Sequence, residues 1–435
     1  MMVSLPKKQR LLSESCLESF LSWCEKNEFR MNRKVEVRAK GSVAEYGMIA
    51  IDGLAPGEEL FRIPRSVIIC PQTSAVSKTL EQNQDKLKSD SGWVPLLITL
   101  MYEYTNMDSV WRSYLDLCID HHTFNLPMFW SPDELKKLRG TGIPEAVTRD
   151  LKNIEKEYSA IVLPFMTEYP NLFSEKYHTL DIYKKMVAFV MSYSFTEPSN
   201  DVDDDSVSPP PIMVPMADML NHVSMNNACL KFGKESLQMV TTQAIPAGEE
   251  VYNTYGELSN WHLLHMYGFA EKPLDNLFDV VEFTSTELFE QARLMKDLKI
   301  ELLDDKVALL GKEDTFVVGD EGVLTEDELY STLKVLFMSV DEFMVHKENE
   351  GWTSDDDDGN DINLTFDHLK DLPLPWTNLL ASVARQSLKR YYREDEESVD
   401  RKNSNILCAA LYADYVKDGQ IKILQKMLDF LNVIH

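Results

Sequence analysis

Two strand-like segments that lie far apart in the sequence constrain the fold of this 435-residue chain most strongly. The first, residues 34–65, alternates like a strand at its start and contains the turn Pro56-Gly57. The second contains IPAGEEVY at 245–252, which resembles LAPGEELF at 54–61, and both phrases are typical of tight turns between strands. The stretch between them, about 75–195, has helical spacing instead. We therefore expect two β-rich pieces, far apart in the sequence, that flank a helical insertion.

Helical patterns dominate the rest of the chain. They cover Glu14–Phe29, three places in the insertion (Trp93–Tyr104, a start at Ser131-Pro132, and Leu180–Tyr193), and, beyond Pro273, the segments Thr284–Leu303, Thr325–Phe343, Trp376–Tyr392 and Asn403–Val433. Acidic stretches at 200–211 and 354–359 are expected to be solvated loops. The fold class predicted is α+β, with an N-terminal helix (1–29), a β-rich domain (30–270) and an all-helical C-terminal domain (275–435).

The charge and the cysteines narrow the classes of function. A net charge of −27 disfavours nucleic acid or an anionic membrane as the main partner and favours basic protein segments. The six cysteines are scattered without metal-ligand spacing, so we expect no zinc site and no disulfide framework. No apolar run approaches the roughly 20 residues of a membrane span, and the first residues lack the apolar core of a signal peptide. These features predict a soluble intracellular protein.

Two phrases contain residues suited to chemistry. In VPMADMLNH, the polar residues Asp218, Asn221 and His222 lie within about one helical turn, although a short helix ending on polar caps would give the same pattern. In VYNTYGELSNWHLLHMYGF, Tyr255 and Tyr267 each precede a glycine. Such tyrosines are also common as core residues with a bonded hydroxyl, and Gly268 is also consistent with a helix C-cap.

Taken together, these phrases resemble the signature of SET-domain protein lysine methyltransferases. The resemblance rests on Asn221-His222, on NTYG at 253–256, on YGF at 267–269 and on YGMI at 46–49. The split β core and the helical C-terminal half are similar to the Rubisco large-subunit methyltransferase branch of that family. Further matches extend it over nearly the whole chain: SGWVPLL at 91–97, LPMFW at 126–130, SYSFTEP at 192–198 and FVVG at 316–319.

The resemblance implies a fold, a cofactor and a set of site residues. The implied fold is a SET core with a pseudoknot, a chain crossing that departs from the usual unknotted rule, where Asn221-His222 meets residues 253–256. The implied cofactor is S-adenosylmethionine (AdoMet), and the implied metal content is none. Tyr255 is the implied catalytic residue. The other implied residues bind the cofactor (Val43, Ala44, Glu45, Tyr193, Asn221, His222, Tyr267, Phe269) or the substrate (Trp93, Tyr193, Thr196, Asp218, Tyr255).

The implied reaction transfers a methyl group to a lysine ε-amine, which must be neutral to react. A tyrosine-lined, apolar channel would lower the pKa of that amine by desolvation, and Tyr255 would orient it rather than act as a base. The resemblance further implies monomethylation of non-histone transcription regulators such as the RelA subunit of NF-κB, with histones as an alternative substrate. It also implies residence in the nucleus, with the cytoplasm as an alternative location.

Several alternatives remain at this level. Glu45 stands where the family commonly has the first glycine of its cofactor loop, which is compatible with a catalytically silent module that binds basic peptides. A histidine or small-molecule methyltransferase of the same fold is a further possibility. Trp93 could be a packed core residue. His262 and His265 share one helical face, but without a third ligand a packed or solvated helix is the better interpretation.

Overall fold

The computed structural model describes residues 7–38, 43–44, 46–120, 124–198, 209–272, 275–311, 314–348, 363–391 and 404–432. The chain divides into two compact units, each with its own hydrophobic core. The first comprises Met1–Trp130, Glu145–Glu257 and His262–Phe269, and the second comprises Ser131–Pro144, Leu258–Trp261 and Ala270–His435. Glu45 and most of the two acidic loops predicted at 200–211 and 354–359 lie outside the described residues.

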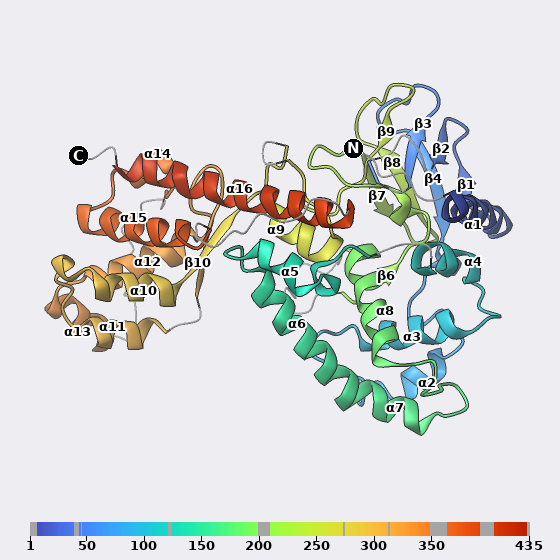
Figure 1. Ribbon diagram of the computed structural model, residues 1–435, viewed down its shortest axis with the longest axis horizontal. Coiled ribbons are helices and arrows are strands. Elements are labelled where there is room, and N and C mark those ends of the chain that lie inside the picture. The colour runs from blue at the N-terminus through green and yellow to red at the C-terminus, as the bar shows by residue number, and fades with distance from the viewer. Residues whose placement is uncertain are drawn as a thin grey trace. The chain divides into compact units, whose positions relative to one another are not determined.

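The strands of the first unit pair across large sequence separations, as the sequence predicted (Figure 1). One sheet has the order β1-β4-β8-β7 and another the order β2-β3-β9, all neighbours antiparallel. A third pairs β5 with β6. The strands are β1 (Arg30–Met31), β2 (Val35–Arg38), β3 (Gly47–Ala50), β4 (Glu59–Pro64), β5 (Ser194–Phe195), β6 (Ile212–Met213), β7 (Ala228–Phe232), β8 (Ser236–Thr241) and β9 (Glu250–Val251).

The two similar turn phrases lie against each other. Leu54 and Ile245 form an antiparallel bridge, the Gly57 N–H donates to Thr241 O, and the Gly248 N–H donates to Ala50 O. Both glycines have left-handed backbones, with φ of 78° and 91°, which glycine adopts without steric cost. The recurrence of Pro/Ala-Gly-Glu-Glu therefore reflects two turns of the same kind, one just before β4 and the other just before β9.

Helices fill most of the insertion between the two β segments, as predicted. Those of the first unit are α1 (Lys7–Lys26), α2 (Ser77–Gln82), α3 (Val94–Thr105), α4 (Arg112–Leu115), α6 (Ile143–Glu157), α7 (Leu163–Glu168) and α8 (Leu180–Tyr193), with π-helical segments η2 (Asp116–Asp120), η5 (Tyr158–Val162) and η7 (Leu263–Tyr267). Helix α8 begins where Thr179 accepts a hydrogen bond from the Ile182 N–H. Helix α1 ends before the predicted Phe29 because Glu28 adopts a φ of 62°.

The second unit is mainly helical, and one prediction about it was wrong. Its helices are α5 (Pro132–Leu135), α10 (Ser285–Leu294), α11 (Leu303–Leu310), α12 (Glu326–Phe337), α13 (Val340–Glu348), α14 (Phe366–Leu369), α15 (Leu374–Leu388) and α16 (Ser404–Asn432), and α9 (Asn260–His262) begins in this unit. The prediction of an all-helical C-terminal domain is too narrow, because β10 (Val281–Thr284) pairs antiparallel with β11 (Thr315–Val318). These short segments are rich in valine, phenylalanine and threonine, which favour strands.

Two predicted long helices are each broken in the structure for local reasons. The segment predicted as 284–303 ends its helix at Leu294, and Lys299 and Leu302 then adopt left-handed backbones. The segment predicted as 325–343 is divided at Met338, where Ser339 and Glu342 cap the next helix. By contrast, Ser131 starts α5 with a capping box to Glu134, as its sequence indicated.

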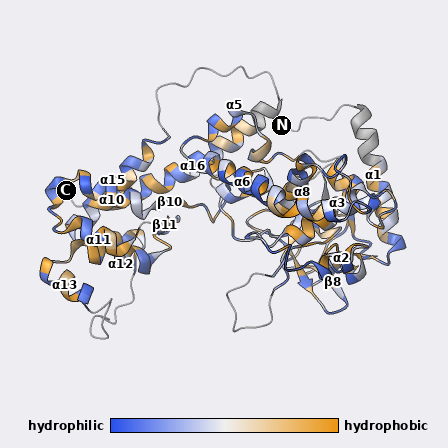
Figure 2. Ribbon diagram, turned by 90° about the horizontal axis from the view of Figure 1, so that it is seen from below, coloured by the Kyte–Doolittle hydropathy of each residue, from blue (hydrophilic) through white to orange (hydrophobic). Residues whose placement is uncertain are grey.

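Amphipathic packing accounts for both cores. Along the helices in Figure 2, hydrophobic segments alternate with hydrophilic ones, as expected for elements with one buried face. In the first unit, β3 is buried at all four positions, and Phe20, Phe61 and Phe189 are fully buried. Among the helices of the described ranges, none combines the length and apolar content that crossing a membrane would require.

Gly268 ends η7 and fixes the backbone between two aromatic residues, Tyr267 and Phe269. Its φ of 79° makes it a left-handed C-cap, and a Cβ placed there would lie 2.7 Å from the backbone oxygen of Asn125. The Asn125 side chain donates to Gly268 O at 2.9 Å. No side chain fits this contact without displacing backbone, so glycine is required both by conformation and by space.

We predict that Gly268→Ala destabilises the protein by about 3 kcal/mol, the sum of left-handed strain and steric overlap. Gly57→Ala is the matched control, because Gly57 has a similar φ of 78° but nothing within 4 Å of its Cβ position. The Gly57→Ala substitution should lower the free energy of unfolding by roughly 1–2 kcal/mol through backbone strain alone. Denaturant unfolding measures both, and equal losses would show that the Asn125 contact is unimportant.

Candidate active site

Two segments that are remote in sequence meet beside the β2-β3-β9 sheet. Asn221 and His222 follow the 3₁₀ turn η6 (Ala217–Met219), and Asn253 follows β9. His222 and Asn253 form a parallel bridge, and the Asn253 N–H donates to Asn221 O at 2.9 Å. This contact brings together the Asn-His and Asn-Thr-Tyr-Gly phrases, as the sequence predicted.

Four aromatic side chains then gather into one cluster. Tyr255 is at its centre: its ring stacks on Tyr267 with centroids 4.7 Å apart and on His222 at 5.0 Å, both with 24° between the planes. Phe269 meets Tyr255 edge to face at 6.4 Å and also contacts His222 and Tyr267. We call His222, Tyr255, Tyr267 and Phe269 the aromatic cluster. Tyr267 ends the π-helical segment η7, a geometry that is often found at functional sites.

The hydroxyl of Tyr255 is held in a fixed direction. It donates to Leu220 O at 3.0 Å, while the backbone N–H of Tyr255 donates to His222 Nδ1 at 3.0 Å. Burial raises the pKa of the Tyr255 phenol, and the neighbouring Tyr267 adds to the effect. Burial also raises the pKa of Tyr267 to about 12. Both phenols are therefore protonated at neutral pH.

His222 is neutral, and one of its nitrogens finds no partner among the described residues. Burial lowers its pKa to about 4. Because Nδ1 accepts the hydrogen bond from Tyr255, the proton of the neutral ring lies on Nε2. Within the described part of the chain, Nε2 is buried and has no hydrogen-bond partner. A buried N–H of this kind is costly unless it donates to an acceptor, so the site suits a ligand that offers one.

Asp218 supplies a second buried atom that lacks a partner within the described part of the chain. Its side chain accepts a hydrogen bond from the Tyr114 hydroxyl through Oδ2, but Oδ1 has no partner among the described residues. Burial raises the pKa of Asp218 to about 7. The Asp218 charge also contributes to the raised pKa of the Tyr255 phenol, which places the carboxyl near the aromatic cluster.

Tyr193 is connected to Asp218 through Tyr114. The Tyr193 ring packs on Phe189 at 5.5 Å, Phe189 packs on Tyr114 at 6.0 Å, and the Tyr193 charge contributes to the raised pKa of Tyr114. Tyr114 was missed in the sequence, because a single tyrosine in a helical insertion has no local signal of function.

Glu250 was also missed, and it connects two predicted cofactor-binding residues. The Val43 N–H donates to Glu250 Oε2 at 2.7 Å, and Asn221 Nδ2 donates to Glu250 Oε1 at 2.7 Å. Asn221 Nδ2 is also 2.7 Å from Tyr46 O. The sequence did contain a signal for Glu250. When two consecutive glutamates enter a strand, the alternation of side chains places one of them on the inner face.

The remaining predicted residues are placed as follows. Ala44 adjoins Val43 in the chain, and Glu45 is outside the described residues. Trp93 precedes α3 and packs, partly buried, against the core of the first unit. Thr196 is exposed just after β5. Their roles in binding stay predictions.

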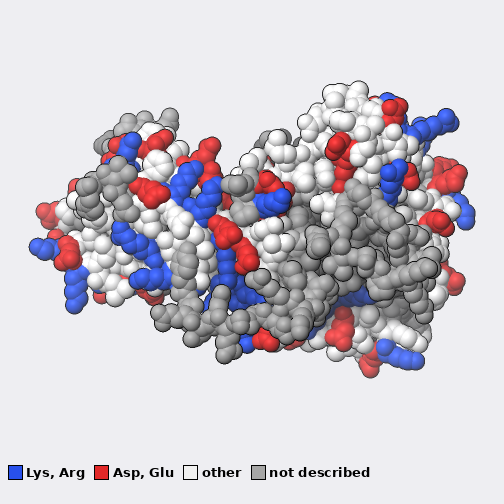
Figure 3. Space-filling view, turned by 45° about the horizontal axis from the view of Figure 1, so that its top comes forward, with Lys and Arg blue, Asp and Glu red and all other residues white. Residues whose placement is uncertain are grey.

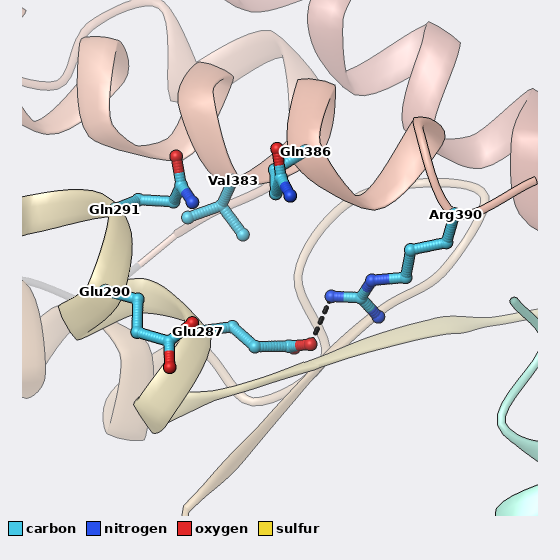
Figure 4. Close-up of a pocket in the computed structure, with 6 residues that line it drawn as sticks. All are labelled: Glu287, Glu290, Gln291, Val383, Gln386 and Arg390. Carbon is cyan, nitrogen blue, oxygen red and sulfur yellow. Dashed lines mark hydrogen bonds and ion pairs between the residues drawn. The ribbon is translucent and has the colours of Figure 1, made fainter. Parts of the chain in front are cut away.

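Other polar features involve residues outside the aromatic cluster. His265 Nε2 lies 2.8 Å from Asp150, and within the described ranges no three His, Cys, Asp or Glu side chains gather to form a metal site. In the second unit, a hollow of about 100 Å³ lies between α10 and α15 (Figure 4). Its lining includes the ion pair of Glu287 with Arg390 and shares no residue with the aromatic cluster.

The pairing of His222 with Tyr255 predicts a pH effect on stability. The folded pKa of about 4 lies below the ordinary 6.5, so the unfolded chain binds the proton more tightly and stability is lost as pH falls through 6.5. Between about pH 7.5 and about pH 5.5, protonation of His222 in the unfolded chain should lower the free energy of unfolding by about 1.4 kcal/mol. His222→Asn, which keeps an acceptor for the Tyr255 N–H, should remove this loss.

Urea unfolding of both proteins at the two pH values measures the difference. Asp218 acts with the opposite sign, because its raised pKa favours the folded state as pH falls through 7, but it is present in both proteins and cancels in the comparison. An identical pH slope in the two proteins would mean that the imidazole is not held neutral by burial.

Comparisons with known proteins agree with this geometry. The SET domain family model matches residues 45–256. The N-lysine methyltransferase setd6 of Xenopus laevis is 44% identical over 97% of this chain and 98% of its own length. The human N-lysine methyltransferase SETD6 is 37% identical, with 94% of each chain covered.

Among solved structures, the SET domain of LSMT bound to lysine and AdoHcy superposes with a TM-score of 0.67 at 19% identity, covering 97% of this chain and 91% of its own. Rubisco LSMT bound to AdoMet gives 0.67 at 18% identity, covering 96% and 92%. This likeness confirms the predicted SET fold. Because relatives with well over 30% identity span almost its whole length, the chain belongs to the SETD6 family of SET-domain N-lysine methyltransferases.

Proposed function

We propose that this protein transfers a methyl group from AdoMet to the ε-amine of a lysine in basic protein segments, with Tyr255 as the catalytic residue. The observation that carries the proposal is the aromatic cluster, in which a buried Tyr255 is clamped between Tyr267 and His222 with its hydroxyl oriented. The SETD6 relatives named N-lysine methyltransferases, and the related folds solved with AdoMet, AdoHcy and lysine, support it.

The residues present fit such a cofactor. Among the residues that the structure describes, Nε2 of His222 is a buried donor without an acceptor, and Oδ1 of Asp218 is a buried acceptor without a donor. A ligand with both acceptors and donors, such as a nucleoside carrying an amino-acid group, can pair with both. Asn221, His222, Phe269 and the backbone of Val43 and Ala44 would hold it. AdoMet then supplies a methyl group on a sulfonium, ready for in-line displacement.

The protein's contribution is position and protonation state. Holding amine and methyl in line can supply roughly 7–11 kcal/mol. A lysine with its ordinary pKa near 10.4 is almost fully charged at neutral pH, and a dry site surrounded by rings lowers that pKa. The stacked faces of Tyr255 and Tyr267 provide such an environment, since burial is also what raises their own pKa.

Tyr255 orients the amine rather than removing its proton. Its phenol is protonated, and its O–H is directed to Leu220 O. The oxygen keeps acceptor capacity, which it can offer to an N–H of the incoming amine. Accepting one N–H turns the nitrogen lone pair toward the methyl group. The hydroxyl therefore acts as a fixed acceptor beside a reaction in which the amine becomes positive.

The finer identity of the substrate rests on charge and family. The net charge of −27 favours lysine-rich targets through the overall field of the protein. On the face shown in Figure 3, acidic and basic side chains are interspersed, so this acidic excess does not appear there as one patch. We propose transcription-regulatory proteins such as RelA, and histones, as substrates, and the nucleus as the place of action.

We predict that Tyr255→Phe lowers kcat by about 10²–10³-fold, the range seen when one preorganised polar group is lost from an active site. AdoMet affinity should change little, because the stacked ring is retained. Tyr158→Phe is the matched control: its buried hydroxyl also donates to a backbone carbonyl, that of His178, outside the aromatic cluster. Transfer of labelled methyl to a basic protein measures kcat.

Two outcomes would contradict the proposal. Unchanged kcat in Tyr255→Phe would remove the catalytic role of the hydroxyl. No heat of AdoMet binding to the wild-type protein in calorimetry would instead favour a silent module that only binds basic peptides.

We further propose that the product is monomethyl-lysine, because the stacked Tyr255 and Tyr267 leave little room around the amine. Tyr267→Ala should therefore shift the product toward dimethyl-lysine, because removing the ring opens space for a methylated amine. Mass spectrometry of a modified peptide gives the ratio. Dimethyl-lysine as the main wild-type product would contradict monomethylation.

A further inference from the structure

Glu250 is a buried carboxylate that joins three segments of the first unit. Its side chain accepts from the Val43 N–H and from Asn221 Nδ2, each at 2.7 Å, and it also bonds the Tyr252 side chain. Only 5% of the residue is exposed. It enters β9 opposite Ile49 of β3, the strand that follows residues 43, 44 and 46.

Two hydrogen bonds connect the backbone of Val43 and Tyr46 to the rest of the first unit. Val43 is 60% exposed as a whole residue, so apolar burial does not anchor it. Instead, Glu250 holds the Val43 N–H, and Asn221 holds Tyr46 O. Because Asn221 is itself bonded to Glu250, one carboxylate is connected to Val43 directly and to Tyr46 through Asn221. The described residues Val43, Ala44 and Tyr46 are called the cofactor segment below.

A buried carboxylate is expensive, and this one has no role in the reaction described above. Burial raises its pKa, whereas its bonds to Asn221, Val43 and Tyr252 lower it. A neutral side chain of the same shape would avoid the desolvation cost. What only a carboxylate offers is two acceptor oxygens that take hydrogen bonds from different donors at once.

We propose that Glu250 is a positioning residue that sets the backbone of the cofactor segment for AdoMet. This rests on the proposed function, since it assigns Val43 and Ala44 to the cofactor. Glu250 does not touch the reacting atoms. It acts by fixing, before the cofactor arrives, the direction in which that backbone faces, which lowers the ordering cost of binding.

The test compares Glu250→Gln with Glu249→Gln in the full-length protein. Both remove one negative charge, but Glu249 is exposed and precedes the strand. In Glu250→Gln an NH₂ group replaces one acceptor, so a donor faces either Val43 N–H or Asn221 Nδ2. The dissociation constant for AdoMet, measured by calorimetry, should rise roughly tenfold in Glu250→Gln and stay within about twofold in Glu249→Gln.

Two further readouts separate positioning from general damage. At saturating AdoMet, kcat of Glu250→Gln should stay within about threefold of wild type, so the loss appears in KM. In the ligand-free proteins, hydrogen–deuterium exchange of the Val43 amide should be faster in Glu250→Gln only. If that variant does not fold, Tyr252→Phe, which removes one partner of Glu250, should show the same pattern with a smaller change.

Equal AdoMet affinity in the two glutamine variants would overturn the proposal, as would an unprotected Val43 amide in the wild-type protein. A wild-type protein that does not bind AdoMet would defeat the proposed function instead. The ligand-free exchange comparison would still decide whether Glu250 holds the segment.

Discussion

The bridge between His222 and Asn253 is the contact on which the site depends. It joins a segment that follows η6 to one that follows β9, and from it come the bond of Asn253 N–H to Asn221 O and that of Tyr255 N–H to His222 Nδ1. Backbone hydrogen bonds in a buried place must be satisfied, so this pairing has one register. That register determines which face of Tyr255 meets His222 and which meets Tyr267.

The site works through neutral groups in a dry place. His222 is kept neutral by burial, and the phenols of Tyr255 and Tyr267 stay protonated for the same reason. None of them needs to exchange a proton during methyl transfer. This suits a displacement in which alignment supplies most of the advantage, and it explains why rings surround the hydroxyl. The nearby carboxyls, Asp218 and Glu250, are each bonded to donors that limit the cost of burying them.

The sequence predicted the structural features that depend on neighbouring residues or on the spacing of motifs. The turns at 54–61 and 245–252, the start of α5 at Ser131 and the whole of α8 followed from turn residues, caps and apolar periodicity. It did not predict Tyr114 or Glu250, because their partners, Asp218 and Val43, are distant in sequence and only the fold brings them together. The β10-β11 pair was missed because each strand has four residues and directly adjoins helical or turn sequence.

The bridge between the turn phrases at 54–61 and 245–252 has a consequence for how the chain acquires its structure. Strand β3 can pair with β9, and β4 with β8, only after the helical insertion between them in the sequence has been synthesised. Pairings of such long range close slowly, because the entropy of a large loop is lost before any contact is gained. During synthesis the insertion helices can form first, and the early strands keep unpaired edges until Val251 has emerged from the ribosome. A nascent chain of this protein is therefore most prone to aggregate at β3 and β4, and most in need of a chaperone there.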